Sequence, residues 1–199
     1  MLGFLQNKKG CKVHQFALLE EQYQATEYGF LANIHARKIK DIIRDFILLQ
    51  TSPVFFILEL PTNARDELLI RKSETEPFHT DVYYIDGLNA DKAVALLDKY
   101  GELLVHDGLS SFGFGAHDSS AEILSTKYNI VMLFTKLRKA YGDFFAEHDI
   151  PFVEKCVTAW DTFAETTPGE CTRITVNNKD VFALPQELKS YGIYFAERR

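Results

Sequence analysis

The chain has 199 residues and a formal net charge of −6, and 46% of its residues are hydrophobic. This composition excludes a globally disordered chain, and the modest number of basic residues argues against an extended phosphate-binding surface and a nucleic-acid partner. No linker-like segment divides the sequence, so we expect one globular domain over residues 1–199.

The cysteines and the apolar runs bear on the compartment of the protein. Cys11, Cys156 and Cys171 follow no disulfide or zinc spacing, which predicts three free thiols in a reducing environment. The first fifteen residues contain lysines but no apolar stretch of the kind found in secretory signals. The longest apolar run, residues 54–60, is too short to span a bilayer. We therefore expect a cytoplasmic protein without a membrane partner.

The clearest amphipathic pattern lies between residues 31 and 50, where apolar side chains recur at helical spacing. It predicts one helix over 31–50, which ends before Pro53. The side chains that this helix would bury on a sheet include Ile39, Ile42, Ile43 and Phe46. Residues 54–58 are typical of a buried strand, and the polar residues 71–77 are typical of an exposed loop.

The middle of the chain alternates between strand and helix patterns. Residues 81–85 predict a strand, and Asn89 predicts the N-cap of a helix. We expect this helix to end at Gly101, because glycine commonly follows the last helical residue. Short strands are then predicted over 102–105 and 111–116.

The last third is rich in turn residues. The run 128–134 predicts another apolar strand, and a helix with aromatic residues on one face is expected after it. Further predicted elements are a strand over 158–163, a hairpin turn at Asn177-Asn178, a short helix from Pro185 to Gly192 and a closing strand over 193–196. Strands and helices alternate without regular βαβ spacing. The sequence thus predicts an α+β fold, with a mixed or mainly antiparallel sheet packed against two or three amphipathic helices.

Residues 100–118 combine histidine, carboxylate, serine and glycine residues more densely than any other segment. The spacing G-x-S-S-x-G over 108–113 is one residue longer than the nucleophile elbow of serine hydrolases. Glycines let a backbone approach a ligand closely, so a ligand site is expected here, and a purely structural hairpin is the alternative. The candidate binding residues are His106, Asp107, Ser110, Ser111, His117 and Asp118.

Trp160 is the single tryptophan of the chain, and Asp161 follows it. Tryptophan is enriched in binding hot spots, which makes Trp160 and Asp161 further candidates for a partner contact. A single tryptophan is more often an anchor of the core, and we favour that interpretation for Trp160.

His79 and Asp81 are two positions apart, which places an imidazole and a carboxylate on one face of a strand. This pair resembles the His-x-Asp half of the metal site of non-haem Fe(II) oxygenases, which add a distal histidine. The resemblance implies His117 or His148 as the third ligand. The 2-oxoglutarate-dependent members of that family carry an arginine after the distal histidine, at a spacing where this chain has Lys127.

Two classes of function are compatible with these features. The first is a non-enzymatic cytosolic protein-binding domain, for example an immunity or neutralising protein that masks a basic partner with carboxylates around aromatic anchors. The chain has no complete catalytic signature, and no cofactor is expected for this class. The alternative is a metal-assisted enzyme of the non-haem iron type that uses His79 and Asp81. The metal content of the purified protein separates the two.

Overall fold

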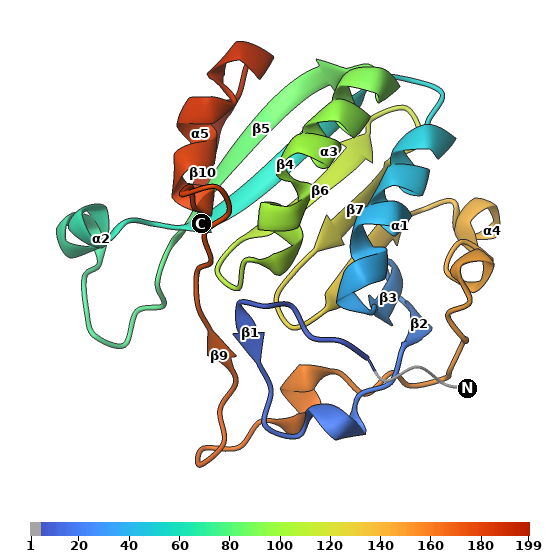
Figure 1. The fold of residues 1–199 in the computed structure, drawn as a ribbon, viewed down its shortest axis with the longest axis horizontal. Helices are drawn as coiled ribbons and strands as arrows, with labels where there is room; N and C mark the ends of the chain where they lie inside the picture. Colours follow the sequence, from blue (N-terminus) through green and yellow to red (C-terminus); the bar gives the residue numbers. More distant parts are fainter. Residues whose placement is uncertain (1–4) are drawn as a thin grey trace.

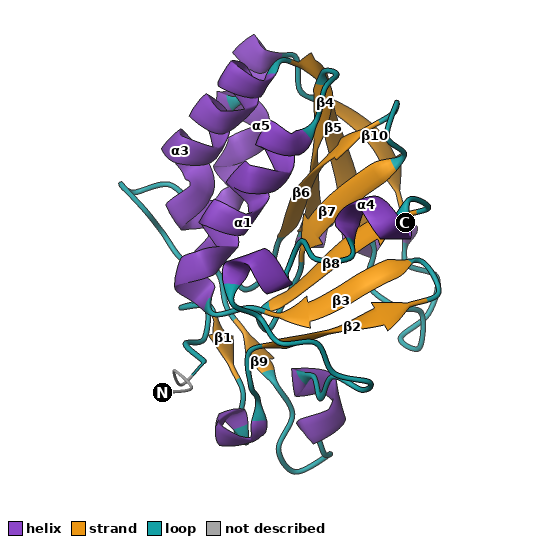
Figure 2. Ribbon diagram, turned by 90° about the vertical axis from the view of Figure 1, so that its right-hand side faces the viewer, coloured by secondary structure: helices purple, strands orange, loops and turns teal. Residues whose placement is uncertain are grey.

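Within residues 5–199, which the computed structural model describes, eight strands form one antiparallel sheet in the order β10-β5-β4-β6-β7-β8-β3-β2. The longer helices lie on one side of this sheet, and two short strands pair separately near its lower end (Figures 1 and 2). The strands are β1 (Cys11–Lys12), β2 (Gln22–Thr26), β3 (Gly29–Asn33), β4 (Val54–Pro61), β5 (Thr80–Leu88), β6 (Ser111–Ala116), β7 (Ala121–Ser125), β8 (Ile130–Thr135), β9 (Glu170–Cys171) and β10 (Tyr194–Arg198). The helices are α1 (Ala36–Leu49), α2 (Ala64–Ile70), α3 (Ala90–His106), α4 (Arg138–Tyr141) and α5 (Leu184–Glu187). The predicted α+β fold with an antiparallel sheet is confirmed.

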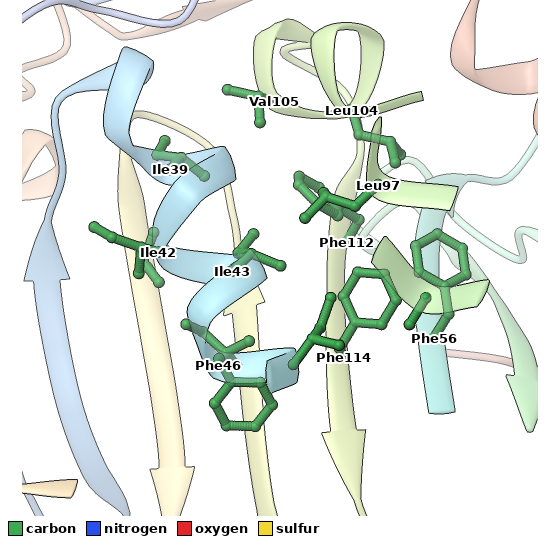
Figure 3. Packing of buried hydrophobic residues seen from close by; sticks show 14 of the residues in the cluster. Ile39, Ile42, Ile43, Phe46, Phe56, Leu97, Leu104, Val105, Phe112 and Phe114 are labelled. Carbon is green, nitrogen blue, oxygen red and sulfur yellow. The ribbon is translucent and has the colours of Figure 1, made fainter. Parts of the chain in front are cut away.

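The core lies between the sheet and the helices α1 and α3. The fully buried side chains of α1 include Ile39, Ile42, Ile43 and Phe46, which confirms the predicted apolar face. Figure 3 shows them opposite Phe112 and Phe114, which β6 directs towards the helices. Alternate residues of a strand point to the same side of the sheet. The apolar side chains of β6 on this side and those on the buried face of α1 therefore belong to one cluster.

The helix α1 is shorter than the predicted helix over 31–50. It begins at Ala36, because residues up to Asn33 belong to β3, which pairs with β2 and with β8. The ring Nδ1 of His35 accepts the backbone N–H of Arg37 at 3.2 Å and caps the helix. The apolar residues of β3 run directly into the apolar period of α1. The pattern therefore does not mark the boundary.

The helix α3 continues through Gly101 to His106, so the predicted helix end at Gly101 and the predicted strand over 102–105 are both wrong. Gly101 faces α1, and a Cβ at this position would lie 3.2 Å from Cδ of Lys40. The glycine thus permits close packing of two helices instead of ending one. The predicted N-cap is confirmed, since Oδ1 of Asn89 accepts the backbone N–H of Lys92 at 2.9 Å.

Several other predicted elements are confirmed with shifted ends. The expected strands over 54–58, 81–85, 111–116 and 128–134 correspond to β4, β5, β6 and β8. The turn at Asn177-Asn178 has positive φ at both residues, and α5 and β10 form near the predicted final helix and strand. The strand over 158–163 is wrong, because Ala159–Thr162 is a 3₁₀ turn closed by a capping box. The helix expected after β8 is reduced to α4 and one 3₁₀ turn, Ala146–His148.

A second, smaller apolar cluster lies around β1 and β9. Its buried members are Leu5, Cys11, Val13, Leu19, Tyr128 and Ala159. Cys11 and Cys156 are buried, and Cys171 is half-buried. None of the helices within residues 5–199 combines the length and the apolar character that a bilayer span requires.

Candidate functional site

The predicted site at 106–118 is divided by a strand. His106, Asp107 and Ser110 precede β6, whereas His117 and Asp118 lie in the turn after it. The strand β6 is six residues long, so the two groups lie at opposite ends of the sheet layer. The structure does not bring these residues together as one site.

Asp107 is an architectural residue of the loop after α3. Its side chain is fully buried, and Oδ1 accepts the backbone N–H groups of Leu109 at 2.8 Å and Ser110 at 2.9 Å. Oδ2 accepts the backbone N–H of Ile174 at 3.2 Å. A buried carboxylate with three amide donors is satisfied by the fold itself and does not point at a ligand.

His106 and Gly108 join this loop to the N-terminal segment. Nδ1 of His106 accepts the backbone N–H of Lys9 at 3.3 Å, and burial lowers the pKa of His106 while Glu102 opposes that shift. A Cβ at Gly108 would lie 1.9 Å from the carbonyl oxygen of Gly10. The glycine is therefore required by close backbone packing, in agreement with the structural interpretation of this part of the segment.

The other end of the segment is exposed. His117 and Asp118 lie at the surface in the β6–β7 turn, and the ring of His117 is 4.9 Å from that of Phe55. Ser111 is the half-buried first residue of β6. The side chains of Ser111, His117 and Asp118 do not line the cavity of about 580 Å³ beside α2.

Trp160 is not an anchor of the core, because 58% of the residue is exposed. Its ring packs edge-on against Tyr128 at 5.1 Å and Phe163 at 5.4 Å. Asp161 has a capping role, since Oδ2 accepts the backbone N–H and the hydroxyl of Thr158, each at 2.8 Å. The expectation of a buried tryptophan is wrong, and Trp160 is available at the surface.

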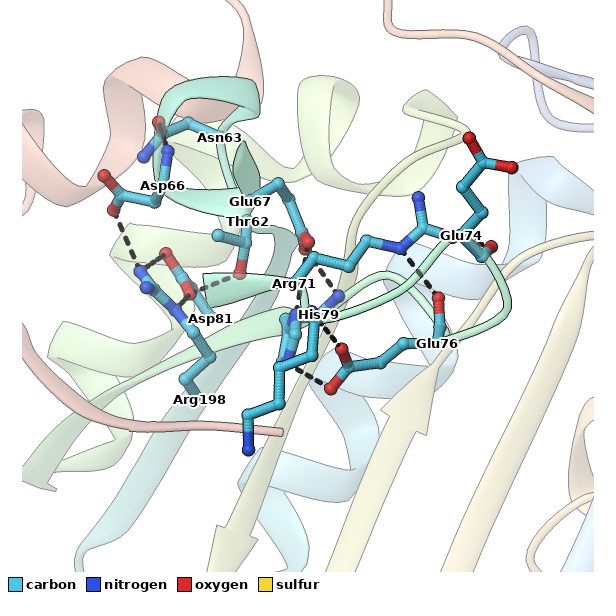
Figure 4. Close-up of polar contacts among 11 residues, drawn as sticks. Thr62, Asn63, Asp66, Glu67, Arg71, Glu74, Glu76, His79, Asp81 and Arg198 are labelled. Atoms are coloured by element: carbon cyan, nitrogen blue, oxygen red, sulfur yellow. Dashed lines mark hydrogen bonds and ion pairs between the residues drawn. The ribbon is translucent and has the colours of Figure 1, made fainter. Parts of the chain in front are cut away.

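His79 and Asp81 point towards different partners (Figure 4). Asp81 accepts hydrogen bonds from Oγ1 of Thr62 at 2.6 Å and from Nε and Nη2 of Arg198 at 2.5 and 3.1 Å. His117 is remote from both, since it follows the end of β6 that pairs with the start of β4, whereas Thr80 pairs with the last residue of β4. Within residues 5–199 no group of three or more metal-ligating side chains is close enough to hold an ion.

The segment 62–79, which we call the β4–β5 insertion, joins two strands that pair directly with each other. Figure 1 shows its helix α2 to the side of the sheet, apart from α1 and α3. Of the seven residues of α2, all of them described, the buried one is Glu67, at 6% exposure. Leu68 and Leu69 are 86% and 78% exposed, and Phe78 is 71% exposed. The usual arrangement of an amphipathic helix is inverted here.

Polar contacts close the insertion on itself and also tie it to the sheet (Figure 4). Oε1 of Glu67 accepts the backbone N–H of His79 at 2.6 Å, and Oε2 lies 3.2 Å from Nδ1 of the same histidine. Arg198 of β10 donates to Asp66 at 3.1 Å while it also binds Asp81. Directional contacts to a few carboxylates thus replace the apolar packing that holds α1.

These carboxylates are stabilised in their ionised form. Burial opposes ionisation of Glu67, but the hydrogen bonds from His79 outweigh it, and the pKa of Glu67 is lowered. Burial likewise opposes ionisation of Asp81, and the hydrogen bonds from Arg198 and Thr62 lower its pKa nonetheless. The attachment of the insertion therefore depends on charge.

A cavity of about 580 Å³ opens beside α2. Its lining includes Thr62, Glu67, Leu68, Arg71 and Phe78. The guanidinium carbon of Arg71 lies 4.2 Å from the ring centroid of Phe78, so this exposed ring is held in place from one side. Leu68 lines this cavity, and Leu69 is exposed next to it in the sequence.

Residues 62–70 carry no predicted element, although an N-cap signal is present. Oδ1 of Asn63 accepts the backbone N–H of Asp66 at 3.0 Å, and Asp66 and Glu67 give α2 an acidic first turn.

No protein-family model matches the chain, and no curated protein and no solved structure is significantly similar to it.

Proposed function

We propose that this chain is a protein-binding domain whose contact element is the β4–β5 insertion. The observation that supports the proposal most is the inversion of α2, which buries Glu67 and exposes Leu68 and Leu69. Each exposed leucine forgoes roughly 1.5–3 kcal/mol of burial, which the folded monomer does not recover. Contiguous apolar side chains on a projecting element are typical of a surface that a partner covers.

The partner that fits this surface is a protein with an apolar groove. Leu68 and Leu69 are both exposed for insertion into such a groove, and the cavity beside Phe78 accepts an apolar side chain in return. The cavity lining balances Glu67 and Glu74 with Arg71 and Lys72, so it is the net charge of −6 of the chain that favours basic groups on the partner. Neutralisation of a basic protein, as by an immunity protein, is the form of this function that the charge supports.

The test uses a photo-reactive residue at position 69 to capture the partner in the native cell. The affinity of the purified partner is then measured for the unmodified chain and for Leu68→Gln. We expect roughly 30-fold weaker binding for Leu68→Gln, because a hot-spot leucine in a desolvated groove contributes about 2 kcal/mol or more.

The matched control is Leu18→Gln, since Leu18 is also exposed but lies outside the insertion. This variant is expected to bind as tightly as the unmodified chain. Equal affinity of the partner for all three proteins would contradict the proposal. Self-association that Leu68→Gln abolishes would identify the partner as a second copy of the chain.

A further inference from the structure

Cys11 and Cys171 face each other across the short sheet of β1 and β9. They are register partners, and their Sγ atoms are 4.0 Å apart. The backbone N–H of Thr172 donates to the carbonyl of Gly10 at 2.8 Å, so the neighbouring cysteine pair is of the non-hydrogen-bonded type. Side chains approach most closely in such pairs, and their Cα spacing of about 4.5 Å lies within the range of disulfides. Rotation of the side chains is enough to bring the sulfurs into bonding distance.

The two thiols have unequal environments. Cys11 is buried, and its sulfur accepts the backbone N–H of Tyr128 at 3.5 Å. Cys171 is half-buried and therefore more accessible to a small reagent. The hydrogen bond from Cys11 lowers the pKa of Cys171 against the opposing effect of burial, and the Tyr128 hydroxyl and two lysines, Lys127 and Lys8, add to the lowering. The same contact and burial raise the pKa of Cys11.

Lys8 supplies a buried positive charge next to this pair. Its side chain is 1% exposed, and Nζ donates to Oγ of Ser125 at 2.9 Å and to the carbonyl of Thr126 at 2.5 Å. Burial lowers the pKa of Lys8 to about 8, and Cys11, Asp107 and Cys171 oppose the shift. A buried ammonium group is costly without negative charge nearby, and a thiolate at Cys171 provides such a charge.

We propose that Cys171 and Cys11 form a redox-modification site, at which a hydroperoxide oxidises Cys171 and Cys11 then closes a disulfide. In the first step the Cys171 thiolate attacks one peroxide oxygen. The S–O bond forms, the O–O bond breaks, and the released hydroxide or alkoxide takes a proton from water. In the second step the Cys11 sulfur attacks the sulfenic sulfur, the S–S bond forms, and the hydroxyl group leaves with the thiol proton as water.

The disulfide joins the N-terminal segment to the C-terminal third of the chain, since the two cysteines are 160 positions apart. Figure 1 shows β1 and β9 side by side. The third cysteine provides an internal reference. Cys156 is buried elsewhere, where its sulfur lies 3.7 Å from the carbonyl of Gln22, and burial raises its pKa to about 11.

The experiment treats the reduced full chain with hydrogen peroxide at neutral pH and follows its intact mass. We expect the mass to fall by two hydrogen atoms and peptide mapping to connect Cys11 with Cys171. Cys156→Ser is expected to behave in the same way. Cys11→Ser is expected to gain one oxygen at Cys171, which a sulfenic-acid reagent labels, and Cys171→Ser is expected to form no disulfide.

A second measurement needs no variant. Limiting iodoacetamide should alkylate Cys171 of the native chain at least about tenfold faster than Cys156, because the thiolate is the reactive species. A disulfide that includes Cys156 would overturn the proposal. The proposal would also be overturned if Cys11 in Cys171→Ser gained oxygen as fast as Cys171 does in Cys11→Ser. The same holds if the oxidised chain contained no disulfide, or if iodoacetamide alkylated Cys171 and Cys156 equally fast.

Discussion

The helices α1 and α2 use their side chains in opposite ways. α1 buries Ile39, Ile42, Ile43 and Phe46 against the sheet and leaves its charged residues outside. α2 buries Glu67 and leaves Leu68 and Leu69 in solvent. Apolar burial stabilises a helix without regard to direction, whereas a buried carboxylate does so only while its donors stay aligned. We infer that the core carries the global stability and that the β4–β5 insertion has its own, weaker attachment.

The largest effect is expected where the core is emptied. Ile43→Ala removes buried methyl and methylene groups from a fully enclosed position opposite β6. The cavity left behind should lower the free energy of unfolding by roughly 2–5 kcal/mol, which denaturant titration measures. An unchanged denaturant midpoint would show that α1 does not pack on the sheet as described.

A smaller and local effect is expected when the contact that closes the insertion is removed. Glu67→Ala leaves the backbone N–H of His79 without its acceptor, because that contact is made by Oε1 at 2.6 Å. The opening equilibrium of the insertion should rise about tenfold or more, and hydrogen exchange of residues 64–79 reports it. The exchange of α1 should stay unchanged.

The matched control for this contact is Glu74→Ala, since the side chain of Glu74 is exposed in the same insertion. It is expected to leave exchange as it is in the unmodified chain. If both variants accelerated exchange equally, the loss of charge rather than the buried hydrogen bond would be responsible. If Glu67→Ala destabilised α1 as well, the insertion and the core would be one cooperative unit.

The difference between the two helices also explains which features the sequence reveals. The apolar period of α1, the N-cap Asn89 and most strands follow from local patterns, because their side chains pack as the pattern predicts. In α2 the leucines are exposed and the glutamate is buried, so an apolar pattern gives no guide to its orientation. Gly101 wrongly predicts a helix end for a related reason, since this glycine packs against Lys40 of α1, a contact that the local sequence does not reveal.

The candidate site was predictable only in part. The glycines within 106–118 mark places where the backbone packs closely against neighbouring segments, but the length of β6 separates the two ends of the predicted site. The approach of Cys11 to Cys171 depends on a pairing of distant strands, and nothing in the spacing of the cysteines indicates it. Such contacts are decided by the tertiary fold, which local periodicity does not encode.

The pH dependence of the two regions should differ. The folded-state pKa of Glu67 lies below its ordinary value of 4.5, so the folded form binds the proton less tightly than the unfolded form does. The contribution of Glu67 to the stability of the insertion is therefore complete above about pH 4.5 and is lost as the pH falls through the lower folded-state value.

Hydrogen exchange, corrected for the intrinsic exchange rate, measures the protection of the insertion. This protection should be constant from neutral pH down to about pH 4.5 and should decrease at lower pH. The apolar contacts of α1 do not titrate, so its protection should decrease later. Glu67→Gln should remove part of the acid response and leave the part that comes from Asp81, whose pKa is also lowered. A decrease that begins in α1 first would contradict the separation of the two regions.

The smallest effect on stability is expected at the surface that we assign to the partner. Leu68 is 86% exposed, so Leu68→Gln loses almost no buried area, and glutamine is a good helix former. The free energy of unfolding should change by no more than about 0.5 kcal/mol, as for surface substitutions in general. Thermal and denaturant unfolding would measure this.

A loss above about 1 kcal/mol would mean that Leu68 packs within the monomer, and the inverted helix would then no longer support a partner surface. An unchanged stability combined with weaker partner binding separates recognition from folding at this residue, which no substitution in the core can do.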